Sequence, residues 1–210
     1  MRLPCVSWRH AGTRRGGAVI LPPMPPVRFS PEHTALLVVD MQEKLLPHIH
    51  EHEKVLGQCC RLAEGAGTVG LPRLVTEQYR KGLGVTVESL ASRLEEPAVL
   101  CEKMRFSADV EPVRQVLTRQ QVRAVVLCGI ESHVCVLQTA LDLMERGLVV
   151  AVAADATGSR RPADRDWALQ RMAQAGVVPV TVESLLLELV REAGTPLFKA
   201  ILPLIREPGG

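Results

Sequence analysis

Short apolar runs alternate with longer amphipathic segments along most of this chain. Apolar runs of strand length, bounded by turn-forming residues, are typical of strands buried on both faces of a parallel sheet. They occur at residues 34–40, 72–78, 98–103, 122–129, 148–155 and 177–181. Apolar residues at helical intervals of three and four occur at residues 53–70, 109–121, 132–147, 162–176 and 182–194. The alternation predicts an α/β fold, a three-layer α/β/α sandwich around a mostly parallel, doubly wound sheet.

Residues that favour helix ends agree with this division. Gly147 and Gly176 follow the last apolar positions of two predicted helices, where a left-handed residue ends a helix. Pro162 stands at the start of the second of these helices, a position that proline tolerates. We expect Asp109 to be the N-cap of the helix at residues 109–121.

Composition narrows the class of protein. The chain has 210 residues, of which 47% are hydrophobic and 23% charged, the balance of a globular domain. Its formal net charge is only +2, whereas nucleic-acid binding needs a concentrated basic surface. No apolar run approaches the ~20 residues of a membrane span. We therefore expect neither nucleic acid nor a membrane as a partner.

The first thirty residues differ from the rest of the chain. They contain five arginines, no acidic residue and the proline cluster "PPMPP". Arginine-rich, acid-poor segments occur in mitochondrial targeting sequences, but these prolines would break a helix. We favour a disordered tail, or an upstream start with Met24 as the working initiator. The predicted division is a tail at residues 1–30 and one domain at residues 31–208.

Cysteine usage indicates a reducing compartment. The six cysteines, at positions 5, 59, 60, 101, 128 and 135, show no C-x-x-C spacing. Most lie within strand or helix patterns, so reduced thiols are favoured over a disulfide framework. We interpret Cys59, Cys60, Cys101 and Cys128 as core residues. The expected location is the cytoplasm, with mitochondrial import as the alternative if the N-terminus is a transit segment.

Three side chains of complementary chemistry follow predicted strands. Asp40 and Lys103 stand at the ends of the first and third strands, and Cys135 lies shortly after the fourth. Ligands of open parallel sheets bind at the carboxyl ends of the strands. The sequence therefore predicts that a carboxylate, an ammonium and a thiol meet at one edge of the sheet.

These three groups suit nucleophilic acyl transfer. A thiol is mostly protonated at neutral pH, and both a helix N-terminus and a nearby ammonium favour its thiolate. We expect Cys135 to have both. Asp40 would accept the thiol proton and pass it to a leaving group, while Lys103 balances the charge. Backbone N–H groups at the turn before Cys135 would stabilise a tetrahedral oxyanion.

The surrounding motifs are "VVDMQEKL" with Asp40, "EKMRFSA" with Lys103 and "GIESHVCVLQTALD" with Cys135. In this order they resemble the isochorismatase-like cysteine hydrolase family, over about residues 34–205, and within it the isochorismatase domain-containing proteins. The resemblance implies an Asp–Lys–Cys triad on an α/β/α fold. It also implies a cis peptide bond between Ile130 and Glu131, and an oxyanion hole formed by the N–H groups of Glu131 and Cys135.

Departures from relatives narrow the chemistry. Nicotinamidases of this family bind a metal through an Asp and two His after the second strand, and the segment "TEQYRKGLGVTVESL" has no histidine. We therefore expect no metal and no other cofactor. Isochorismatases proper lack the nucleophilic cysteine, so Cys135 favours hydrolysis of an amide-like C–N bond in a small molecule through a thioester. The residues expected to line the substrate pocket are Gln42, Glu77, Gln78, Tyr79 and Phe106.

Other interpretations of the site remain open at this point. The chain could be a non-catalytic binding or scaffold protein that retains the hydrolase fold. Cys135 could instead cycle through a sulfenic acid, although spacing identifies no resolving thiol. His48 and His52 are one helical turn apart, but no third ligand stands at a matching spacing, so a solvated face is favoured over a metal site.

Two further surfaces have alternative uses. Arg160, Arg161 and Arg165 form either a clamp for an anionic substrate or, as we favour, a charged helix entrance. The leucine-rich segments at residues 182–190 and 198–205 either supply an oligomer interface or pack on their own sheet. By analogy with relatives, we expect a homo-oligomer.

Overall fold

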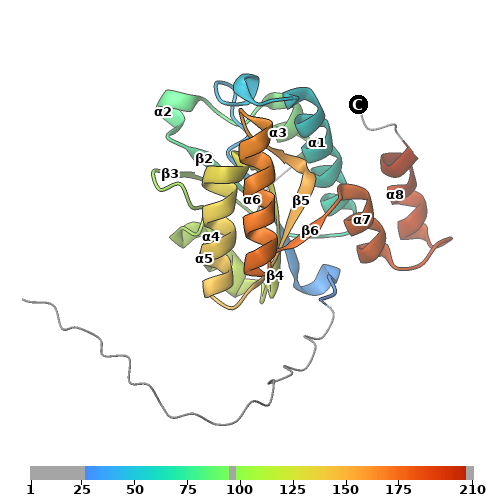
Figure 1. Ribbon diagram of the computed structural model, residues 1–210. Coiled ribbons are helices and arrows are strands. Elements are labelled where there is room, and N and C mark those ends of the chain that lie inside the picture. Colours follow the sequence, from blue (N-terminus) through green and yellow to red (C-terminus); the bar gives the residue numbers. More distant parts are fainter. Residues whose placement is uncertain (1–26, 95–97, 207–210) are drawn as a thin grey trace, which may run out of the picture.

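The computed structural model describes residues 27–94 and 98–206 (Figure 1). In chain order its elements are η1 (Pro31–His33), β1 (Thr34–Val39), η2 (Leu46–His48), α1 (His52–Thr68), β2 (Arg73–Gln78), α2 (Arg80–Leu83), α3 (Glu88–Leu94), β3 (Val99–Lys103), α4 (Glu111–Arg119), β4 (Ala124–Ile130), η3 (Ser132–Val136), α5 (Leu137–Glu145), β5 (Val149–Gly158), α6 (Pro162–Ala175), β6 (Val178–Val180), α7 (Val182–Val190) and α8 (Pro196–Arg206). Residues 1–26 of the expected tail, and residues 207–208 of the expected domain, lie outside the described residues. Phe29 is buried in the core, so the expected boundary at residue 31 is slightly late.

Six parallel strands form one sheet in the order β3-β2-β1-β4-β5-β6. The predicted fold class is therefore confirmed, with every pairing between these six strands parallel. The chain adds β2 and β3 on one side of β1, then crosses to place β4, β5 and β6 on the other side. Such a switch in strand order opens a crevice at the carboxyl ends of the two central strands.

Both faces of the sheet are covered by helices (Figure 1), which is why the central strands β1 and β4 are almost entirely apolar and buried along their whole length. In β1, Leu36 and Val38 pack into the core that contains residues of α1, α3, α7 and α8. Leu37 and Val39 point to the opposite core, which contains residues of α4, α5 and α6. The sheet is thus the middle one of the three predicted layers, with one hydrophobic core between it and the helices on each face.

The leucine-rich C-terminal segments pack within the chain. The buried side chains of α7 and α8 include Leu185, Leu186, Ile201 and Leu204, all in the core shared with α1. Of the two uses predicted for these segments, packing on their own sheet is the one that the structure contains. No helix in the described ranges has both the length and the apolar character of a membrane span.

Several local predictions need correction. Helices α2, α3 and α8 were not predicted, and α7 ends at Val190, before the expected residue 194. Asp109 is not the N-cap of α4, which begins at Glu111 after Val110. The Asp109 carboxylate instead accepts hydrogen bonds from Arg114 and Arg146, because two guanidinium groups within reach are stronger partners than a free backbone N–H.

Candidate active site

The three predicted side chains meet at the carboxyl edge of the sheet, beside the β1–β4 switch point. Asp40 directly follows β1, and Lys103 is the last residue of β3. Cys135 lies in η3, a π-helical turn that connects β4 to α5. All three are buried. The parallel register therefore brings together residues that are 32 or more positions apart in the chain.

Asp40 and Lys103 form a fully buried ion pair. Lys103 Nζ lies 2.7 Å from Asp40 Oδ2, and both side chains have zero exposure. The ammonium also donates to Gln78 Oε1 at 2.8 Å and to the carbonyl of Phe106 at 2.8 Å. Thr76 Oγ1 donates to the other carboxylate oxygen of Asp40 at 3.0 Å. These contacts satisfy both charges, which is the condition for keeping a buried ion pair.

The thiol of Cys135 lies beside this pair. The charges of Asp40 and Lys103 and the backbone of Glu131 all act on the pKa of this thiol, so the sulfur lies in the same buried cluster. The carbonyl of Cys135 accepts from Thr139 Oγ1 at 2.6 Å, which fixes the turn on the first residues of α5.

The charge state of the thiol differs from the expectation. Burial raises the pKa of Cys135 to about 12; the negative charge of Asp40 also raises it, and Lys103 and the Glu131 backbone oppose the rise. Burial also raises the pKa of Asp40, while Lys103 partly offsets that rise. Lys103 lowers the thiol pKa as expected, but burial and the Asp40 charge outweigh it, so the net shift is upward.

The turn before Cys135 has an unusual backbone. The peptide bond between Ile130 and Glu131 is cis, and Gly129 has φ of +112°. A Cβ atom on Gly129 would lie 2.1 Å from the carbonyl oxygen of Val39, so no larger residue fits here. Glycine thus allows β4 to pass close to β1 at the point where both strands end.

Sequence reasoning missed Thr76, which orients Asp40. Its signal was a hydroxyl residue directly after the apolar pair Leu74 and Val75 of a predicted strand, and Thr76 is 0% exposed in the folded chain. A buried hydroxyl needs a hydrogen-bond partner. Because Val39 of β1 pairs with Thr76 of β2, the carboxylate of Asp40, the residue after Val39, lies within reach of the Thr76 hydroxyl.

A family model described as the isochorismatase domain matches residues 34–184. The chain belongs to the isochorismatase family. Isochorismatase domain-containing protein 2A of Mus musculus is 42% identical over 181 residues, covering 86% of each chain.

Two of the solved structures that resemble this chain illustrate what is known of similar proteins. One, described as the MAR1 ribonuclease of Caenorhabditis elegans, has a TM-score of 0.84 at 41% identity, covering 88% of this chain and 95% of that one. The other, the YcaC gene product of Escherichia coli, is described as an octameric hydrolase of unknown specificity. It has a TM-score of 0.79 at 27% identity, covering 87% and 94%.

Within this isochorismatase-family fold, the five expected pocket residues divide into two groups. Gln42 and Glu77 are buried and already engaged. The Gln42 amide donates to the carbonyls of Gln78 and Gly84 and accepts from the Gln78 N–H, while Glu77 Oε1 accepts two hydrogen bonds from Thr86. These two side chains hold the loops after β1 and β2 together. Their expected place in the substrate pocket stays a prediction.

The remaining pocket candidates lie at the edge of the site. Gln78 is 9% exposed, and its Oε1 accepts a hydrogen bond from Lys103 Nζ. Tyr79 and Phe106 are 45% and 53% exposed, and Met104 is 69% exposed beside them in sequence. Of the expected five, the aromatic pair is therefore accessible to a ligand, and Gln78 links it to the buried ion pair.

The other predicted clusters are surface features. His48 ends η2 and His52 begins α1, so the two are not on successive turns of one helix. Within the described residues, no group of three or more His, Cys, Asp or Glu side chains is arranged to hold a metal ion. Arg160 pairs with Glu131, and Arg165 donates to the carbonyls of Ala154 and Thr157.

Proposed function

We propose that this protein is a metal-independent cysteine hydrolase that cleaves an amide-like C–N bond of a small molecule. The observation that carries the proposal is a buried cluster at one edge of the sheet, in which Lys103 Nζ lies 2.7 Å from the Asp40 carboxylate and the charges of both act on the buried Cys135 thiol. A nucleophile in contact with a base, itself held by a third group, is the general arrangement of covalent acyl-transfer enzymes.

In the first half-reaction the thiol proton moves to Asp40 as sulfur attacks the substrate carbonyl carbon. The carbonyl oxygen becomes an oxyanion, and the N–H groups of Glu131 and Cys135 are the proposed donors to it. One such donor is typically worth about 3 to 4 kcal/mol of barrier. Asp40 then returns its proton to the leaving amine as the C–N bond breaks, which leaves a thioester on Cys135.

In the second half-reaction Asp40, ionised again, accepts a proton from water as the water oxygen attacks the thioester. The acid product leaves, and the proton returns to sulfur. One amide and one water thus give one carboxylic acid and one amine. Lys103 keeps its position throughout, because its positive charge stabilises the buried carboxylate in the form that acts as a base.

The proposal needs no metal. The segment after β2 supplies no histidine, and both carboxylate oxygens of Asp40 are engaged by Thr76 and Lys103. A chelator should therefore leave turnover unchanged. We also propose a cytoplasmic location, supported by the free thiols of Cys59, Cys60, Cys101, Cys128 and Cys135.

The test is a screen of amides, ureido compounds and carbamoylated amines, with released ammonia or amine as the readout. Cys135→Ala should abolish turnover, and the matched control Cys101→Ala should retain it, because the half-buried Cys101 lies outside the contacts described. Full activity in folded Cys135→Ala protein would refute the nucleophile assignment.

Two other functions have specific support. A binding or scaffold role is favoured by the pKa of about 12 of Cys135, because such a thiol is inert unless Asp40 removes its proton. Failure of any acyl donor to acylate Cys135, read by mass spectrometry, would support it. RNA cleavage is suggested only by the description of the Caenorhabditis elegans relative as a ribonuclease. Cleavage of labelled single-stranded RNA by this chain, lost in Cys135→Ala, would support that activity over amide hydrolysis.

A further inference from the structure

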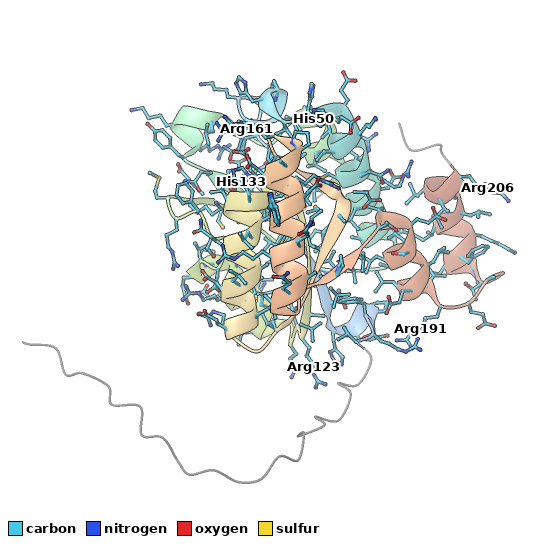
Figure 2. The ribbon with its side chains drawn as sticks, in the orientation of Figure 1. His50, Arg123, His133, Arg161, Arg191 and Arg206 are labelled. Carbon is cyan, nitrogen blue, oxygen red and sulfur yellow. The ribbon has the colours of Figure 1, made fainter. Side chains whose placement is uncertain are left out.

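The turn that carries the proposed oxyanion donor is attached to the end of β5 by side chains. Three consecutive residues after Ile130 each contact a residue at the end of β5 or just beyond it. The pairs are Glu131 with Arg160, Ser132 with Thr157, and His133 with Ser159. Figure 2 shows His133 and Arg161 at the same end of the molecule, opposite the end that carries Arg123 before β4. The β5–α6 connection therefore lies beside the candidate active site.

The first of these pairs involves a buried carboxylate. The carboxylate of Glu131 is buried, with a side-chain exposure of 8%, whereas that of Arg160 is 61%. One oxygen, Glu131 Oε2, accepts from the backbone N–H of Arg160 at 3.0 Å and from its Nε at 3.2 Å. A buried carboxylate without such partners would be costly, so Arg160 determines where the Glu131 side chain can lie.

The peptide group of the same residue lies beside the nucleophile. The backbone of Glu131 lies close enough to Cys135 to lower the pKa of its thiol. The Glu131 carbonyl accepts from the N–H groups of Val134 and Val136 at 3.1 and 3.2 Å. The Glu131 backbone is thus fixed by η3 on one side, and its side chain is fixed by Arg160 on the other.

We infer that Arg160 is a positioning residue for the reaction proposed above. Through the Glu131 carboxylate, it holds the Glu131 N–H where the oxyanion forms, without touching the substrate itself. A donor contributes fully only if it already points at the developing charge, so a small loss of alignment lowers the rate of acylation. The inference rests on the proposed function, because it assigns a role to the same oxyanion donor.

The neighbouring arginine provides a matched control. Arg161 is exposed, flanks the first residue of α6, and has no side-chain partner in the described ranges. It differs from Arg160 in lacking the contact with Glu131 and shares its charge and location. Replacing either residue by alanine removes one positive charge beside the site. The backbone N–H of residue 160 still donates to Glu131 in Arg160→Ala, so any difference between the two variants reports the guanidinium contact rather than the charge.

The experiment uses p-nitrophenyl acetate as the acyl donor, since the native substrate is unidentified. Acetylation of Cys135 forms a tetrahedral oxyanion, and p-nitrophenolate release gives its rate. Iodoacetamide at pH 8.5 is the second probe, because alkylation of the same sulfur forms no oxyanion. Both rates are measured on the full chain and on Arg160→Ala, Arg160→Lys, Glu131→Gln and Arg161→Ala, with kcat and KM separated.

We expect Arg160→Ala to lower kcat for acetylation about tenfold, with KM and the alkylation rate within about twofold of the parent. Arg160→Lys should recover part of the loss, because lysine can still pair with Glu131. Glu131→Gln should lose a similar amount, and the double variant with Arg160→Ala no more than either single one. Arg161→Ala should match the parent.

Several outcomes would overturn the inference. An equal loss of kcat in Arg161→Ala would show that the positive charge matters rather than the contact with Glu131. A rise in KM with kcat unchanged would show that Arg160 contacts the substrate directly. A folded Arg160→Ala protein with unchanged kcat would show that the contact between Arg160 and Glu131 does not affect the reaction. If the parent is alkylated at Cys135 and never acetylated, the oxyanion donors are misassigned while the thiol still reacts. If Cys135 reacts with neither probe, the proposed function itself fails.

Discussion

Replacing Asp40 by asparagine should produce an enzyme that is less active and has a more reactive thiol. In the structure the Asp40 charge is the largest influence on the Cys135 pKa after burial, and it raises that pKa. Asparagine keeps the shape, an oxygen that can accept from Lys103 and an NH2 group that can donate to the Thr76 hydroxyl, and it removes the negative charge. The thiolate of Cys135 then has only the ammonium beside it, so its pKa falls. Turnover is nevertheless lost, because no base remains to move the proton.

The magnitude follows from how far the thiol pKa is raised. A pKa of about 12, against an ordinary value of 9.0, leaves about one thiol in a thousand ionised at pH 9 and corresponds to about 4 kcal/mol. Each unit by which the pKa falls increases the thiolate population tenfold. It also lowers the intrinsic nucleophilicity about threefold, so the net gain in alkylation rate is about three- to fourfold per unit. We expect at least a threefold gain at pH 9, and a loss of turnover of about a hundredfold or more.

The assay is iodoacetamide alkylation of Cys135, followed by mass spectrometry of its peptide in the parent and in Asp40→Asn. Cys135→Ala gives the background from the other thiols, and thermal melts confirm that each variant is folded. An alkylation rate that is unchanged or lower in folded Asp40→Asn protein would refute the electrostatic reasoning. If the variant does not fold, the pH profile of the parent decides: its alkylation rate should rise up to pH 10 without a plateau.

Three further predictions concern the base, the backbone and the assembly. The acid limb of kcat/KM should lie above the ordinary aspartate pKa of about 3.9, because burial raises the pKa of Asp40 and protonation removes the base as pH falls; a limb at or below that value contradicts the assignment. Gly129→Ala should cost more than about 4 kcal/mol in urea unfolding, or prevent folding, because its Cβ would lie 2.1 Å from the Val39 carbonyl oxygen. Gly57→Ala, whose Cβ meets nothing within 4 Å in α1, should stabilise the chain by about 0.5 to 1 kcal/mol. Light scattering after gel filtration should give a mass above that of one chain, as in the octameric relative, and a single-chain mass at all concentrations would refute the expected homo-oligomer.

The apolar pattern predicted the layers because burial on both faces leaves a local signature in each strand. The six runs correspond to the six strands, and the helix ends at Gly147 and Gly176 were also correct, since a left-handed residue is a local requirement. The short α2 and α3 were missed because they contain few residues and little periodicity. Their positions depend on loops that connect β2 to β3, which local spacing does not describe.

The meeting of Asp40, Lys103 and Cys135 was predictable from one geometric rule. Parallel strands end at a common edge, so residues that follow different strands are brought together. The rule gives no distance, and it does not say which partner dominates. The raised pKa of Cys135 depends on burial and on the charge of Asp40, which outweigh that of Lys103, and both depend on how the loops close over the edge.

The sequence by itself determined the succession of the six strands and of the helices α1, α4, α5, α6 and α7 along the chain, the edge where the chemistry lies and the residue types present there. Tertiary structure alone decided that Gln42 and Glu77 hold loops together, while Tyr79 and Phe106 remain exposed. It also decided that Arg160, among three arginines close in sequence, pairs with Glu131. The physical reason is that the periodicity of apolar residues shows which face of each segment is buried and which is exposed to water. Hydrogen-bond and ion-pair partners depend instead on register between segments that are distant in the chain.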